Sequence, residues 1–393
     1  MVGEGRAGGA THRWVWRALA LVLCALLLAS VARFYHRGVG FSALLVIARD
    51  QHQIPALRDV PHYEYAPTQG YDGAFYVQLA MAPLLRDPEI DRALDAPAYR
   101  ARRILFSWTA WALGLGKPAW ILQAYALQNV LCWLALGWLL TRWLPPDRPR
   151  LLALWAASMF SHGLIASVRL SLLDGPSLLL LVLAVAALER GRTWLTAGIN
   201  AIAGLGRETD LLGAAALPRP RGWRGWLRAL AALVVIALPL LVWQDYVWSL
   251  YRGTSLSAGS EQITVPFTAF AGKWLLTLSS VSKHGFTSAA GPTLLVMIAL
   301  TVQTGFIMWT RAVDDPWWRL AAVFAVLMML VRPLVWEGYP GAVTRVVLPL
   351  TFGFNVVLAR LNPARFWWWA VLGNLDIVAS LHQMPIVGIP PPF

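Results

Sequence analysis

The chain has 393 residues, of which 58% are hydrophobic and only 13% charged, and its mean hydropathy is +0.55. Soluble domains carry about 25% charged residues, so this composition argues against a soluble globular protein and indicates lipid as the solvent for much of the chain. The net charge of +13 does not require a nucleic-acid partner, because arginines that flank apolar segments account for much of it.

The first apolar segment, residues 14–32, is preceded by Arg6 and Arg13 and contains Arg17 near its start. The small residues Ser30, Val31 and Ala32 suit a signal-peptidase site, so a cleaved secretory signal is one interpretation. Many apolar runs follow this one, which favours an uncleaved signal anchor instead. Both interpretations place the chain from residue 33 onward across the membrane.

Residues 33–118 form a long loop that holds eight of the twenty acidic residues. Apolar side chains recur at helical spacing in 72–86 and again in 98–116. Such amphipathic helices lie in the plane of the membrane interface with the apolar face down. We therefore predict two interfacial helices in this loop, the second beginning near Arg100, Arg102 and Arg103.

The rest of the chain is a series of apolar runs, each compared with the roughly 20 residues that a spanning helix needs. The run at 209–217 is too short to cross by itself, and we expect it to be tilted or broken. A second outer loop, 250–288, contains another helical pattern through Phe267, Phe270, Trp274 and Leu278. Beyond 14–32, the predicted spans lie near 119–140, 151–168, 173–189, 193–206, 209–217, 229–249, 289–310, 319–335, 345–359 and 366–381.

These segments predict an all-α polytopic membrane protein in which residues 1–393 form a single membrane domain with about 10–11 transmembrane helices. With the amino terminus inside, the inner segments carry sixteen arginines, and the short outer loops carry seven arginines and lysines. Positively charged residues concentrate in cytoplasmic loops, so the bias predicts a cytoplasmic amino terminus. The loop 33–118 is then non-cytoplasmic.

Ionisable residues at the edge of a membrane are costly, so they are candidates for function. In the predicted topology they gather on the outer side. Asp72 begins the first interfacial helix, Asp174 lies at the outer end of a span, and Arg207 and Glu208 lie where two apolar runs meet. Arg345 lies in an outer turn near the carboxyl end, together with Arg332, Glu337 and Tyr339.

Three short stretches carry a resemblance: Tyr71–Tyr76 (YDGAFY), Pro97–Leu105 (PAYRARRIL) and Gly206–Thr209 (GRET). Together with the order of one span, a long outer loop with an early acid and a second acid at the outer end of a later span, they resemble bacterial integral-membrane glycosyltransferases of the GT-C fold. The layout is more distantly similar to GPI mannosyltransferases, protein O-mannosyltransferases and the aminoarabinose transferases of lipid A.

The resemblance implies a polyprenyl-phosphate-linked sugar donor and a lipid, glycan or protein acceptor, bound on the non-cytoplasmic face of the bacterial inner membrane. It matches Asp72 to the family's acid in the first loop and Asp174 to its second outer acid. The family motif often has two adjacent acids, whereas Gly73 follows Asp72 here, so the sequence departs from a pair of carboxylates.

The chemistry can also be argued from residue types. Transfer to an alcohol needs a base for the hydroxyl proton, and Asp72 is the candidate, with a pKa that we expect burial to raise. Arginine binds phosphate bidentately and offsets its charge, which makes Arg102, Arg103, Arg207 and Arg345 candidates for the leaving phosphate. Tyr71, Tyr76 and Tyr99 are candidates for binding the sugar or lining a lipid portal.

Each of these residues also has a structural interpretation. Asp72 and Asp174 are common types for helix caps. Arg102 and Arg103 are equally typical of headgroup anchors, and Glu208 is expected simply to pair with Arg207. No cluster of histidines and acids has metal-ligand spacing, so a divalent metal has no support in the sequence.

Two other functions remain open. The first is a transporter or flippase of lipid-linked or polar solutes. Transporters tend to show internal repeats and paired broken helices near the midplane, whereas this sequence shows no repeat and places its charges at one face. The second is a non-enzymatic membrane partner of an envelope assembly machine, for which Asp72 and Asp174 would be dispensable.

Overall fold

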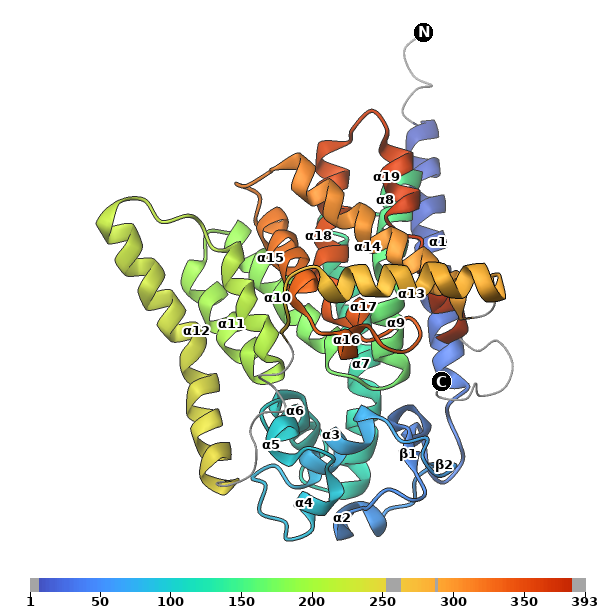
Figure 1. Cartoon of the computed structure of the whole chain (residues 1–393), viewed down its shortest axis with the longest axis vertical. Coiled ribbons are helices and arrows are strands. Elements are labelled where there is room, and N and C mark those ends of the chain that lie inside the picture. The colour runs from blue at the N-terminus through green and yellow to red at the C-terminus, as the bar shows by residue number, and fades with distance from the viewer. Residues whose placement is uncertain (1–6, 252–262, 287–288, 384–393) are drawn as a thin grey trace.

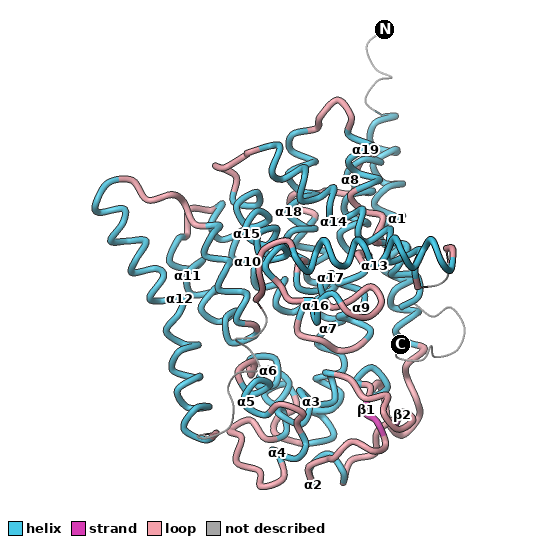
Figure 2. Tube along the Cα trace, viewed as in Figure 1, coloured by secondary structure: helices cyan, strands magenta, loops and turns pink. Residues whose placement is uncertain are grey.

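The computed structural model describes residues 7–251, 263–286 and 289–383, with side chains from residue 13 onward. The protein is 71% helical (Figures 1 and 2). The strands in the described residues are two pairs of residues, β1 (Ile47–Ala48) and β2 (Glu64–Tyr65), which run parallel with Ile47 opposite Glu64. The prediction of an all-α protein is confirmed at this level.

Four helices are long and apolar enough to cross a membrane: the part of α1 from Arg13 to Ala32, α7 (Pro118–Leu140), α12 (Gly222–Leu250) and α14 (Ala290–Thr310). The segment predicted as a span at 151–168 is instead broken into α8 (Pro149–Met159) and α9 (His162–Arg169), which meet at an angle of 46°. Counted as one span, this pair is a fifth candidate.

The other predicted spans are shorter or interrupted. The expected helix at 319–335 ends at Leu330 and resumes at Pro333, and 209–217 is a 3-10 helix. The predicted span at 366–381 is divided into three short pieces. The elements are α10 (Asp174–Glu189), α11 (Thr193–Gly206), η2 (Glu208–Ala216), α15 (Pro316–Leu330), α16 (Pro333–Trp336), α17 (Val343–Val346), α18 (Leu348–Leu361), α19 (Phe366–Leu372), α20 (Ile377–Ser380) and η4 (Leu381–Gln383).

The helices of the bundle lie side by side, and the connections predicted to be cytoplasmic meet at one end of it, near the start of α1 (α1: Ala7–Ala32; Figure 1). Arg360 at the end of α18 donates to Glu189 and to Asp315, each at 2.6 Å, and Arg142 lies 3.4 Å from Glu189. Four connections far apart in sequence are thereby joined. The segment after α1 lies at the opposite end.

That segment folds into short elements against the end of the bundle: η1 (Ser42–Leu45), α2 (Pro55–Arg58), α3 (Asp72–Met81), α4 (Ile90–Ala93), α5 (Pro97–Ala101) and α6 (Leu105–Leu113). The helix predicted to begin at Asp72 is present, but its apolar side chains are not turned outward as an interfacial helix requires. Tyr76, Val77 and Leu79 are fully buried, because α3 packs between α6 and α7. It also stops at Met81, since Pro83 cannot continue it.

The helix expected at 98–116 is interrupted at Arg102–Ile104, which separates α5 from α6. This break turns Arg102 and Arg103 away from a regular helix face, while Trp111 and Leu113 of α6 stay exposed as an interfacial helix requires. In the second outer loop, the predicted helix is present as α13 (Thr268–His284), which lies across the bundle and exposes Leu275 and Leu276 (Figure 1).

Candidate active site

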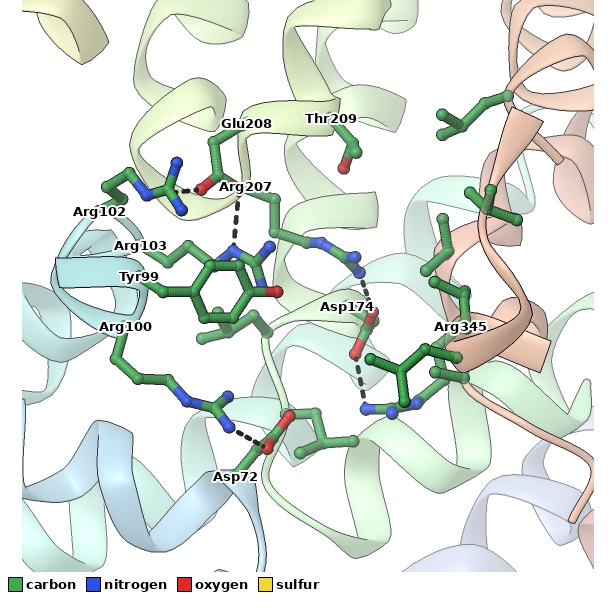
Figure 3. Close-up of a pocket in the computed structure, with 18 of the residues that line it drawn as sticks. Asp72, Tyr99, Arg100, Arg102, Arg103, Asp174, Arg207, Glu208, Thr209 and Arg345 are labelled. Carbon is green, nitrogen blue, oxygen red and sulfur yellow. Dashed lines mark hydrogen bonds and ion pairs between the residues drawn. The ribbon is translucent and has the colours of Figure 1, made fainter. Parts of the chain in front are cut away.

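A cavity of about 740 Å³ lies between the segment after α1 and the end of the helix bundle (Figure 3). Its size is within the range of small-ligand sites. The prediction that Asp72 and Asp174 face one cavity is confirmed. All ten residues singled out in the sequence line it: Tyr71, Asp72, Tyr76, Tyr99, Arg102, Arg103, Asp174, Arg207, Glu208 and Arg345.

Asp72 is the first residue of α3, and Tyr71 occupies the cap position before it. No side-chain hydrogen bond caps this helix. Instead, the Asp72 Oδ1 atom lies 2.8 Å from the Arg100 Nη2 atom, and 30% of the Asp72 side chain is exposed in the cavity. The interpretation of Asp72 as a helix cap is therefore wrong, and its carboxylate is accessible to a ligand.

Gly73 explains why a second carboxylate does not follow Asp72. A Cβ atom at position 73 would lie 2.8 Å from the carbonyl oxygen of Leu170 and 2.9 Å from that of Leu45. Both are backbone atoms that cannot move aside. The close approach of α3 to these two segments therefore excludes any side chain at this position, and the site has one acid here, not two.

Arg100 is the cavity residue that the sequence interpretation missed. Its guanidinium forms two hydrogen bonds of 2.8 Å with Asp95 in addition to its contact with Asp72. It also lies over the rings of Phe75, Tyr76 and Tyr99. The available signal was the Asp95–Arg100 spacing across a short helix that begins at Pro97, but sequence spacing alone does not reveal the third contact, to Asp72.

Asp174 is the first residue of α10, is 7% exposed and joins two arginines from distant parts of the chain. Arg207, which follows α11, pairs with its Oδ1 atom, and Arg345 of α17 lies 3.6 Å from its Oδ2 atom. Arg345 also donates to the Tyr71 hydroxyl at 2.9 Å. The α10 amino terminus receives no cap from Asp174, so this interpretation too is wrong.

Glu208 does not pair with Arg207 as expected. Its carboxylate lies 2.9 Å from Arg103 and 3.7 Å from Arg102 (Figure 3). These two arginines are only 15% and 17% exposed, so they are not headgroup anchors on the surface. The ring of Tyr99 stacks against both guanidiniums. The break between α5 and α6 directs Arg102 and Arg103 into the cavity, and Tyr99 reaches it from α5.

The charge of Asp72 is set by competition between burial and arginines. Burial raises the pKa of Asp72, whereas Arg100, Arg345 and Arg103 lower it. The combined effect of the three arginines is larger than that of burial, so the pKa lies below its ordinary value. The expectation of a raised pKa is wrong for this reason. The pKa of Glu208 is likewise lowered, since Arg103 and Arg102 outweigh the effect of burial. Both carboxylates are ionised at neutral pH.

The cavity lining has five arginines and three carboxylates, and Asp95 outside the lining pairs with Arg100, so one positive charge exceeds the carboxylates that contact these arginines. Three buried polar atoms in it, the Arg102 Nε, the Arg207 Nε and the Tyr76 hydroxyl, have no hydrogen-bond partner within the part of the chain that the structure describes. Buried polar groups are normally paired, so these atoms are available to hydrogen-bond a bound ligand. The electrostatics favour an anion.

One wall of the cavity is apolar. It is formed by Leu212 of η2, by Leu327 of α15 with the following Val331, and by Leu334 and Val335 of α16. Across the described ranges, no group of three or more His, Cys, Asp and Glu side chains could hold a metal ion. The arrangement suits a molecule with an anionic head and an apolar tail.

Comparison of the chain with protein-family models, with curated proteins and with solved structures finds no match. The fold and the cavity therefore have to be interpreted from their own geometry.

Proposed function

We propose that this protein is a membrane glycosyltransferase that transfers a sugar from a polyprenyl-phosphate donor to a lipid, glycan or protein acceptor. The observation that carries the proposal is the cavity itself, in which an ionised, accessible carboxylate and an excess of arginines face an apolar wall. A phosphate joined to a long hydrocarbon chain matches both halves of this lining.

The proposal places the chain in the bacterial inner membrane with its amino terminus in the cytoplasm. The shorter apolar helices then complete a GT-C-like set of about 10–11 spans, of which several are broken or tilted. The cavity lies at the non-cytoplasmic end. Its apolar wall, which includes Leu334 with 65% of its surface exposed, offers a way in for the donor chain from the lipid.

The proposed reaction is a displacement at the anomeric carbon. The acceptor hydroxyl oxygen forms a bond to the anomeric carbon. At the same time the bond between the anomeric carbon and the phosphate oxygen of the donor breaks. The proton passes to the Asp72 carboxylate, and the phosphate leaves with the electron pair. Arg207 and Arg345 offset the charge on the phosphate. Arg100 keeps Asp72 ionised, which a proton acceptor requires.

The test is a product assay in membranes with a radiolabelled polyprenyl-phosphate hexose as the probe. We expect Asp72→Asn to lower product formation by about 10²–10⁴-fold, the usual contribution of a general base. Asn keeps the size of the side chain and removes its charge. The matched control is Asp59→Asn, because Asp59 is an exposed acid of the same segment. Its product formation should stay at the wild-type level.

Protein levels have to be matched, because a folding defect imitates catalytic loss. Near wild-type turnover in Asp72→Asn would remove Asp72 as the base. Movement of intact donor across vesicles without sugar release would favour a flippase instead.

A further inference from the structure

The first turns of α12 and the residues before them carry four arginines that the catalytic proposal does not use: Arg219, Arg221, Arg224 and Arg228. All four are exposed, and none forms an ion pair with a carboxylate of the described residues. No acidic residue occurs in the sequence between Asp210 and Asp245. The positive charge of this segment is therefore not compensated by the protein.

Other arginines at the same end of the molecule behave differently. Arg360 and Arg142 share Glu189, and Arg150 donates to Asn362 at 3.1 Å. These side chains hold connections of the bundle together. The four arginines at the start of α12 form no such contacts between connections. The segment before α12 is held beside the start of α15 by Arg319, which donates to the carbonyl oxygen of Ala216.

Tryptophans are interleaved with these arginines. Arg224 and Arg228 lie four residues apart within α12, so they share one side of the helix, and Arg221 directly precedes it. Trp223 and Trp226, 69% and 66% exposed, lie beside them, with the Arg224 guanidinium over the Trp223 ring, and are followed by the exposed apolar Leu227 and Leu230. Figure 1 shows these turns at the outer edge of the molecule, away from the cavity.

We propose that this part of α12 is a binding site for anionic phospholipid headgroups in the leaflet opposite the cavity. Guanidiniums bind phosphate bidentately, and tryptophans prefer the headgroup level of a bilayer. Basic clusters next to a spanning helix attract anionic lipids, and each arginine increases the affinity roughly fivefold. The interleaved tryptophans and the long apolar helix that follows favour lipid over nucleic acid. The inference rests on α12 crossing a membrane and not on the transferase reaction.

The experiment measures lipid binding to the purified full-length protein in detergent by native mass spectrometry, with phosphatidylglycerol and phosphatidylcholine as probes. We expect phosphatidylglycerol to bind at least about tenfold more tightly than phosphatidylcholine. Replacing all four arginines by Gln should abolish this preference. The double variants R219Q/R221Q and R224Q/R228Q should each weaken it severalfold, which keeps the test valid if the quadruple variant does not fold.

The matched control removes the same charge elsewhere at this end, through Arg190, Arg192, Arg311 and Arg365→Gln, all exposed in the structure. It should keep the lipid preference. Equal loss in both quadruple variants would reduce the effect to net charge and overturn the site. Displacement of lipid by millimolar glycerol phosphate would assign a soluble phosphate ester instead, and displacement by an RNA oligonucleotide would assign nucleic acid. Transferase activity is not read out, so this result is independent of the proposed reaction.

Discussion

At the scale of single residues, the site is a set of carboxylates each held by arginines. Asp72 faces Arg100, Asp174 lies between Arg207 and Arg345, and Glu208 lies between Arg102 and Arg103. Because the arginines outnumber the acids, each carboxylate stays ionised and an anionic ligand gains favourable contacts. Arg100 has the largest single effect of the arginines on the charge of Asp72, since it is its nearest cation.

The lowered pKa of Asp72 predicts a pH dependence. Because the pKa of Asp72 is lower in the folded protein than its ordinary value of 3.8, the ionised carboxylate stabilises the fold. This stabilisation is fully present at pH values above 3.8 and is lost as the pH falls through the lowered pKa. Removing Arg100 should raise the pKa of Asp72. We therefore expect the acid limb of the activity profile to move to higher pH in Arg100→Gln, by about one unit or more.

The measurement is the pH at which activity falls on the acid side, and not the maximal activity. Arg100 also lines the cavity, so its replacement can lower activity at every pH. Arg100→Lys keeps the charge and should leave the limb near its wild-type position. The control Arg92→Gln changes an exposed arginine of the same segment and should leave the whole profile unchanged. An unmoved limb in Arg100→Gln would show that Asp72 is not the titrating base.

At the scale of elements, the site depends on close packing and on interruptions of helices. The break between α5 and α6 directs Arg102 and Arg103 inward, and the change from α11 to η2 presents Arg207 and Glu208. The backbone of α3 approaches its neighbours so closely that only glycine fits at position 73.

Gly73→Ala should therefore destabilise the protein by about 1–3 kcal/mol, because the added methyl group overlaps two backbone oxygens. The measurement is the midpoint of thermal unfolding in detergent. The matched control is Gly198→Ala within α11, where an added Cβ meets nothing within 4 Å. That change should be neutral or stabilising by up to about 1 kcal/mol, since Ala is the better helix former. Equal effects at both positions would contradict the packing argument.

At the scale of the whole molecule, the bundle has two different ends. One end holds the cavity and the segment 33–117, and the other gathers the arginine-rich connections. This polarity agrees with the distribution of charge along the sequence, since positively charged loops collect on the cytoplasmic side.

Topology is predicted from this polarity. Reporters fused after residue 80 should be active only outside the cytoplasm, whereas reporters fused after residues 145 and 364 should be active only inside it. Each position needs a pair of reporters with opposite requirements. A cytoplasmic signal at residue 80 would reverse the orientation and place the cavity on the other face.

Much of this protein is determined by its sequence because apolar composition and helical spacing are local properties. The runs that became α1, α7, α12 and α14 are long enough to be recognised without knowledge of their neighbours. The acids and arginines of the site were also recognisable, because ionisable residues at the edge of a membrane are costly and these gather on the outer side of the predicted topology.

Only the tertiary structure decided which of these charges meet. Asp72 could not be assigned to Arg100, nor Glu208 to Arg103 in place of the adjacent Arg207, because such pairs depend on helix breaks that tertiary packing imposes. Arg345 and Tyr71 are 274 positions apart and still share a hydrogen bond. The sign of the Asp72 pKa shift follows from the same contacts: burial alone would raise it, and three arginines brought together by the fold lower it.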